Sequence, residues 1–73
     1  MRRYEIRSEV TGSVWKVLKT VGEVVMAGDE LMIVESMKME IPLIAEESGT
    51  VVEVRFDEGS PIAEGTTVMV IEC

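Results

Sequence analysis

The sequence predicts an all-β fold, with about four short strands in each of two halves that pack face to face or close into a flattened barrel. Three observations favour this fold: short β-branched runs, glycines that separate these runs, and an internal repeat. The 73 residues make one small domain, 1–73, and a chain of this size buries only about 60% of its unfolded surface. We therefore expect a thin core with little room for an internal active-site cleft.

The repeat appears when the sequence is shifted against itself by 37 residues. The two copies span roughly 7–36 and 44–73, and the segment between them, which includes Lys38, belongs to neither. A duplicated scaffold with one unduplicated lysine at its joint suggests a protein built to present that lysine. The identical pairs are Gly12/Gly49, Val14/Val51, Val17/Val54, Gly22/Gly59, Gly28/Gly65, Met32/Met69 and Glu35/Glu72.

Runs rich in β-branched residues mark the strands, and glycines mark the turns between them. Apolar and polar residues alternate in 52–56 with the period of two that is expected of a half-buried strand. Gly22 and Gly28 recur as Gly59 and Gly65, so we expect turns with positive φ at these equivalent places. The expected strands include Val14–Leu18, Leu31–Val34, Val51–Phe56 and Val68–Ile71.

One segment, Glu30–Ile41, is ambiguous because it is rich in helix-forming residues. Taken alone, it is compatible with an amphipathic helix ended by Pro42, in which Lys38 is an ordinary solvated residue. The repeat favours a strand instead, because Leu31–Glu35 aligns with the strand-like Val68–Glu72.

The next strand is expected at Ile41–Ala45, so the chain must reverse near Met37, Lys38 and Met39. Tight hairpins prefer Asn-Gly or Asp-Gly, which accept positive φ at both central positions. A methionine and a lysine break that local preference here. In a chain that obeys the rule elsewhere, such a break often marks a functional site.

Composition argues against several classes of function. Fourteen acidic and seven basic residues give a net charge of −7, which repels nucleic-acid phosphates. The chain has no histidine and a single cysteine, so we expect neither a metal site nor a catalytic residue. No apolar run approaches the roughly 20 residues of a membrane span, and the basic N-terminus lacks the apolar stretch of a secretory signal. We expect a cytoplasmic protein without nucleic-acid or membrane partners.

The hexapeptide Glu35–Glu40, followed by Ile41-Pro42 and later by 48–51, resembles the biotinyl domain of biotin-dependent carboxylases. The similarity is greatest to small free-standing biotin/lipoyl attachment proteins, and it covers essentially the whole chain. It implies a flattened barrel of two four-stranded antiparallel sheets related by a pseudo-twofold axis. It also implies that Lys38, on a hairpin tip, receives covalent biotin from a biotin protein ligase.

The resemblance further implies a carrier that is not itself an enzyme. Such a biotin carboxyl carrier protein shuttles carboxybiotin between a biotin carboxylase and a carboxyltransferase. It implies ligase recognition through Met37 and Met39, whose thioethers are soft, adaptable contacts. Glu35 is a further candidate for recognition, although a purely structural role is equally open because its repeat partner Glu72 has no lysine nearby.

Other interpretations stay open. A lipoyl carrier is the rival within the fold, although lipoyl hairpins typically carry Asp-Lys-Ala rather than Met-Lys-Met around the acceptor. A cofactor-free interaction module is the rival from another class. The final carboxyl acceptor is also open, because the chain lacks the protruding loop of bacterial acetyl-CoA carboxylase carriers. Glu40 is expected to be a solvated charge and Trp15, whose repeat equivalent is Val52, to fill the core.

Overall fold

Strands, without a helix, make up the secondary structure of residues 2–73, the part of the chain that this computed structural model describes. Each half contributes four strands, as predicted, and 30–41 forms two strands and a turn, so the helical alternative is wrong. The eight strands are β1 Arg3–Arg7, β2 Gly12–Val17, β3 Val24–Val25, β4 Glu30–Ser36, β5 Met39–Ile44, β6 Gly49–Val54, β7 Pro61–Ile62 and β8 Thr67–Glu72.

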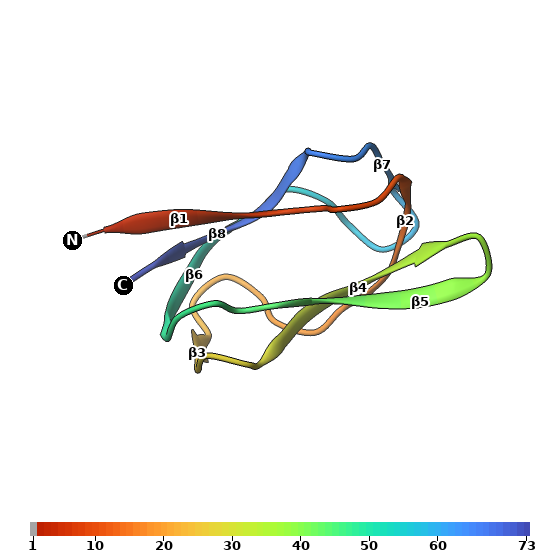
Figure 1. The fold of residues 1–73 in the computed structure, drawn as a ribbon. Helices are drawn as coiled ribbons and strands as arrows, with labels where there is room; N and C mark the ends of the chain where they lie inside the picture. Colours follow the sequence, from red (N-terminus) through yellow and green to blue (C-terminus); the bar gives the residue numbers. More distant parts are fainter. Residues whose placement is uncertain (1) are drawn as a thin grey trace.

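The strands form two four-stranded sheets whose paired strands are all antiparallel. Sheet A has the order β1-β8-β6-β3 and sheet B the order β5-β4-β2-β7, so each sheet takes strands from both halves of the chain (Figure 1). The 37-residue repeat relates β1–β4 to β5–β8 and thereby exchanges the two sheets. The expected pseudo-twofold architecture is confirmed.

Backbone hydrogen bonds repeat with the same symmetry. The Gly22 N–H donates to the Val51 carbonyl at 2.8 Å, and the equivalent Gly59 N–H donates to the Val14 carbonyl at 2.7 Å. These glycines have φ of 96° and 90°, in the left-handed region where a side chain is strained, so the prediction of positive-φ turns is confirmed.

The core lies between the sheets and is built from repeat-related side chains, so the two copies contribute to it in pairs. In the segment 52–56, half-buried residues alternate with exposed ones, which explains the pattern of period two. The central strands β4 and β8 instead contain consecutive buried residues. The buried pairs are Ile6/Leu43, Val14/Val51, Val25/Ile62, Leu31/Val68, Met32/Met69 and Val34/Ile71.

The β4–β5 hairpin projects at one end of the molecule, and the two chain ends lie together at the other (Figure 1). The Cys73 N–H donates to the Arg2 carbonyl at 2.7 Å, which joins the chain ends. Since the molecule measures 36 × 18 × 17 Å, its long axis separates the hairpin tip from the chain ends.

Gly12 allows β2 to approach this hairpin closely, at the end of β4 that leads into the turn. A Cβ atom at Gly12 would lie 2.2 Å from the backbone oxygen of Glu35, far inside van der Waals contact. The equivalent Gly49 has the same relation to Glu72, with a distance of 2.6 Å. A glycine is therefore required at the start of β2, which passes the end of β4, and at the start of β6, which passes the end of β8.

Replacing Gly12 by alanine should destabilise the fold by about 1–3 kcal/mol, the usual cost of forcing extra atoms into a packed site. Urea unfolding measures the loss. Gly49→Ala should lose a similar amount, whereas Ser13→Ala, which adds no atom at the contact, should change stability by less than about 0.5 kcal/mol. Equal stability of Gly12→Ala and the parent would contradict the close approach.

Ion pairs gather on sheet A. Arg7 pairs with Glu5 and Arg55 with Glu53, each at 2.9 Å. Hydrogen bonds from Arg7 and from the Thr67 hydroxyl lower the pKa of Glu5 below its ordinary value of 4.5, and the charge of Arg55 adds to the effect. The carboxylate of Glu5 therefore favours the folded state.

Because the pKa of Glu5 is lower in the folded chain, its stabilising effect is complete above pH 4.5 and is lost as pH falls through the folded pKa. Glu5→Gln should therefore melt below the parent at pH 7, and this difference should shrink as the pH is lowered below about 4. Thermal unfolding followed by circular dichroism from pH 7 to 3 measures it. Glu9→Gln is the control, and a parent–Glu5→Gln difference that widens in acid would contradict the assignment.

Candidate functional site

Met37 and Lys38 alone connect β4 to β5. Their φ angles are 51° and 66°, and they are the only non-glycine residues in 2–73 with positive φ. This conformation costs an ordinary residue roughly 1–2 kcal/mol. The prediction of a tight reversal against local sequence preference is therefore confirmed, and residues held in such a conformation often belong to functional sites.

The turn presents its side chains to solvent. Met37 is 92% exposed and Met39 is 63% exposed, so neither thioether fills the core. Lys38 is also exposed, and within residues 2–73 it forms no ion pair. Its amine is therefore free to react with a partner that approaches the tip.

The end of the hairpin next to the turn is fixed to the rest of sheet B. The Ser36 hydroxyl donates to the Thr11 carbonyl at 2.8 Å, next to the close approach of Gly12 to Glu35. β4 pairs with β2 on one side and with β5 on the other. Only the turn itself projects beyond this paired framework, so Lys38 is held out from a rigid support.

Two carboxylates face each other beside the tip. Glu35 and Glu40 are register partners across β4 and β5, both exposed, and like charges directly opposite one another destabilise a sheet. At the equivalent place in sheet A, Glu72 instead faces Arg3 and pairs with it at 2.9 Å. The same position in the two copies therefore holds an ion pair in sheet A and a pair of carboxylates in the hairpin.

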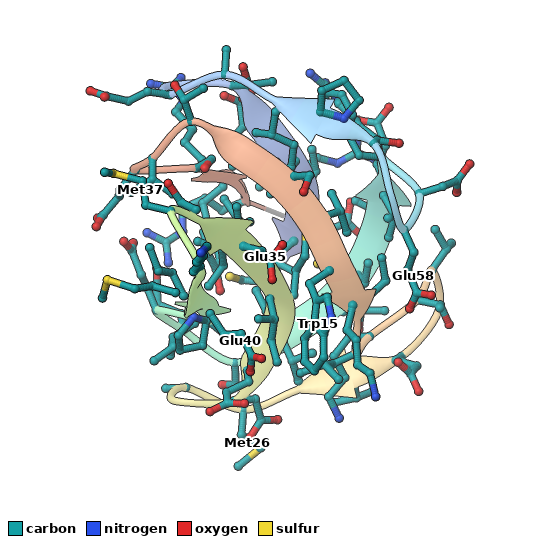
Figure 2. All side chains as sticks on the ribbon, turned by 90° about the vertical axis from the view of Figure 1, so that its right-hand side faces the viewer. Trp15, Met26, Glu35, Met37, Glu40 and Glu58 are labelled. Atoms are coloured by element: carbon teal, nitrogen blue, oxygen red, sulfur yellow. The ribbon has the colours of Figure 1, made fainter. Side chains whose placement is uncertain are left out.

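Glu40 is exposed, as expected of a solvated charge, and the structure adds that it faces Glu35. The signal that could have identified it is its position relative to Glu35, because a two-residue turn at Met37 and Lys38 makes these glutamates cross-strand neighbours. Figure 2, in which sheet B lies in front of sheet A, shows both carboxylates on the side that faces the viewer.

Trp15 corrects another expectation, because it does not fill the core. Its side chain is 42% exposed. Val14 faces the core, so alternation directs the next residue outward, and a bulge between Val14 and Lys16 places Lys16 on the same side. The Lys16 ammonium lies 5.2 Å from the centre of the Trp15 ring, a cation–π distance.

Other kinds of site find little support in residues 2–73. No three His, Cys, Asp or Glu side chains gather there in a way that could hold a metal ion. The same residues include no helix with the length and hydropathy to cross a membrane. A groove of about 340 Å³ between β1 and β5 and a hollow of about 510 Å³ near Phe56 are both lined by residues outside the turn. The Lys38 amine is exposed and forms no ion pair within residues 2–73, so its chemistry allows it to carry a covalently attached group.

Comparison with known proteins gives consistent matches. The family described as "Biotin-requiring enzyme" matches residues 5–71. A biotin/lipoyl attachment protein of Bacillus subtilis is 43% identical over 61 residues, which are 84% of each chain. A pyruvate carboxylase of the same species is 43% identical over 67 residues. The crystal structure of Kluyveromyces lactis urea carboxylase contains a region that superposes with a TM-score of 0.92 at 36% identity and covers 99% of this chain.

The matched relatives differ greatly in size. The chain spans 84% of the attachment protein, but only 6% of the pyruvate carboxylase and 6% of the urea carboxylase. It therefore corresponds to one small part of these large carboxylases and to most of the small protein.

Replacing Met37-Lys38 by Asn-Gly should stabilise the fold by about 1 kcal/mol, since both residues suit the left-handed turn. For a domain of this size the midpoint of thermal unfolding should rise by about 4–8 °C. The same Asn-Gly placed at Met39-Glu40, inside β5, should lower the midpoint, because both residues are poor strand formers. An unchanged or lower midpoint for the first variant would contradict the strain assigned to the turn.

Proposed function

The chain belongs to the Biotin-requiring enzyme family, and from that premise we propose that it is a biotin carboxyl carrier whose Lys38 amine holds biotin in an amide bond. The observation that supports this most strongly is the position of Lys38, exposed at a strained two-residue turn that the internal repeat does not share. Residues 1–73 then make up a single biotinyl domain.

Attachment requires a nucleophile and an activated carboxyl group. Lys38 supplies the nucleophile, and a biotin protein ligase supplies the acyl-adenylate of biotin. The amine nitrogen forms a C–N bond to the acyl carbon, the bond from that carbon to the adenylate oxygen breaks, AMP leaves and the amine loses a proton. Within the described residues 2–73, no ion pair has to be broken before the Lys38 amine reacts.

Biotin, when bound, supplies a ureido nitrogen that accepts and releases a carboxyl group. The protein contributes the tether. A rigid barrel with one projecting hairpin keeps the arm clear of the surface and raises its effective concentration at the sites it visits. We propose a biotin carboxylase and a carboxyltransferase as these partners, with all the carboxyl-transfer chemistry in them and none in this chain. A cytoplasmic location suits ligation and carboxylation, which both consume ATP.

We assign ligase recognition to the side chains around the acceptor. Met37 and Met39 offer exposed, flexible apolar contacts on both sides of Lys38. Glu35 lies beside the tip of the hairpin and, unlike the equivalent Glu72, faces another carboxylate rather than an arginine. Its charge is therefore free for a cationic group of the ligase.

Co-expression with a biotin ligase and free biotin tests the proposal. The intact mass of the chain should rise by one biotin less one water, because a single amide forms. Lys38→Ala should gain nothing, whereas Lys16→Ala, which removes another exposed lysine, should gain the same mass as the parent.

An established carrier protein biotinylated in the same cells serves as the positive control. If the folded parent gains no mass while that control is biotinylated, the proposal is wrong. A mass increase of one lipoyl group, in cells that supply lipoate ligase instead, would identify the lipoyl alternative.

A further inference from the structure

The internal symmetry allows the outer faces of the two sheets to be compared position by position. On sheet A, Val70 lies between its register partners Glu5 and Glu53. Both glutamates form ion pairs, with Arg7 and Arg55 respectively, and Val70 is 6% exposed. At the centre of this face, a buried valine therefore lies between two glutamates whose charges are balanced by arginines.

On sheet B, the residue equivalent to Val70 is Ile33. It lies between Lys16 and Pro42 and is half-buried, with Trp15 next to Lys16 on the same side. Trp15, Ile33 and Pro42 form an apolar row across three strands, here called the β2–β4–β5 row. Figure 2 shows Trp15 on this outer face, in view together with Glu35.

The charges of the two faces differ as well. All four arginines of the chain form ion pairs in sheet A or beside the chain ends. Glu35 and Glu40 lie between the row and the turn, and within residues 2–73 neither has a basic partner. Sheet B therefore combines an exposed apolar row with unneutralised carboxylates, which its symmetry-related counterpart lacks.

We propose that the β2–β4–β5 row, with Glu35 and Glu40, is a docking surface for the biotin protein ligase. The partner surface that fits it is an apolar patch rimmed by arginine or lysine side chains, because such a rim pairs with the free carboxylates. This inference rests on the proposed function. It extends recognition from the hairpin tip to the outer face of sheet B.

The ligase is the partner that must come closest to this face. It reacts with the amine of Lys38 itself, whereas later partners act on the end of the much longer biotinyl arm. The pair Ile33–Pro42 lies three residues along the strands from the last pair before the turn, about 10 Å at 3.3 Å per residue. A standard interface of about 800 Å² per partner has a radius of about 16 Å, so a footprint centred on the tip reaches the row.

A second copy of this chain fits the face poorly. A twofold dimer through sheet B whose axis passes close to the Glu35–Glu40 pair would bring these carboxylates of one copy near the same carboxylates of the other, with Lys16 as the nearby cation. The partner that the charges favour is therefore a basic one.

Steady-state biotinylation of the purified apo chain by purified ligase tests the proposal, with the concentration of the chain varied. Trp15→Ser should raise KM for the chain about tenfold and change kcat less than twofold, because it removes an aromatic contact remote from the reacting amine. The matched control is Val52→Ser, the equivalent position on sheet A, which should stay within twofold of the parent. Circular dichroism verifies that each variant is folded.

Glu40→Arg is a second variant, and a loss of stability could not explain its expected effect on KM. It recreates opposite Glu35 the pairing that Arg3 makes with Glu72, so thermal stability should rise or stay the same. KM for the ligase should nevertheless rise about tenfold, because a basic partner is repelled. Glu53→Arg brings the same change of charge to sheet A and should leave KM within twofold.

The proposal is overturned if folded Trp15→Ser and Glu40→Arg both keep the parent KM. It is also overturned if their losses appear only in carboxylation by a biotin carboxylase, which would make that enzyme the occupant. Both outcomes leave the proposed function intact, because Lys38 of the parent is still biotinylated. Failure of the parent to be biotinylated at all would overturn both proposals.

Discussion

Interleaving of the two half-chains is the constraint on which the rest of the structure depends. Neither half can complete a sheet alone, because β8 and β6 of the second half lie between β1 and β3 of the first, and β4 and β2 lie between β5 and β7. The core is likewise made of pairs with one member from each copy. The close approaches at Gly12 and Gly49 join β2 to β4 within the first copy and β6 to β8 within the second. The thin barrel therefore gains its rigidity from the interleaved pairing of the two copies rather than from size.

The places where the two copies differ indicate which features the fold itself does not require. The joint between the copies is the strained Met37-Lys38 turn, while the equivalent place at the other end is where Arg2 and Cys73 lie side by side. The turn is thus free of the packing that the repeat imposes elsewhere. Glu35 faces the carboxylate of Glu40, whereas the equivalent Glu72 in sheet A faces and pairs with Arg3. Exposure, strain and unbalanced charge therefore meet at one end of the molecule, around a single reactive amine.

Much of this could be predicted from the sequence because the repeat carries long-range information. Alignment of Leu31–Glu35 with the second copy identified a strand where local propensity allowed a helix. The prediction for Trp15 was wrong because it was inferred from the apolar Val52 at the equivalent position, and Val52 is itself only half-buried. The bulge that turns Lys16 to the same side as Trp15 has no clear sequence signal. The opposition of Glu35 and Glu40 depends on register, which becomes known only once the turn is fixed at two residues.

The most direct test of the account is peptide mass spectrometry of the chain purified from its own host cells. The account predicts that the peptide containing Lys38 carries one biotin in an amide bond and that peptides containing Lys16 and Lys19 carry none. An unmodified Lys38 in cells whose other carriers are biotinylated, or a lipoyl group on Lys38, would contradict the central claim.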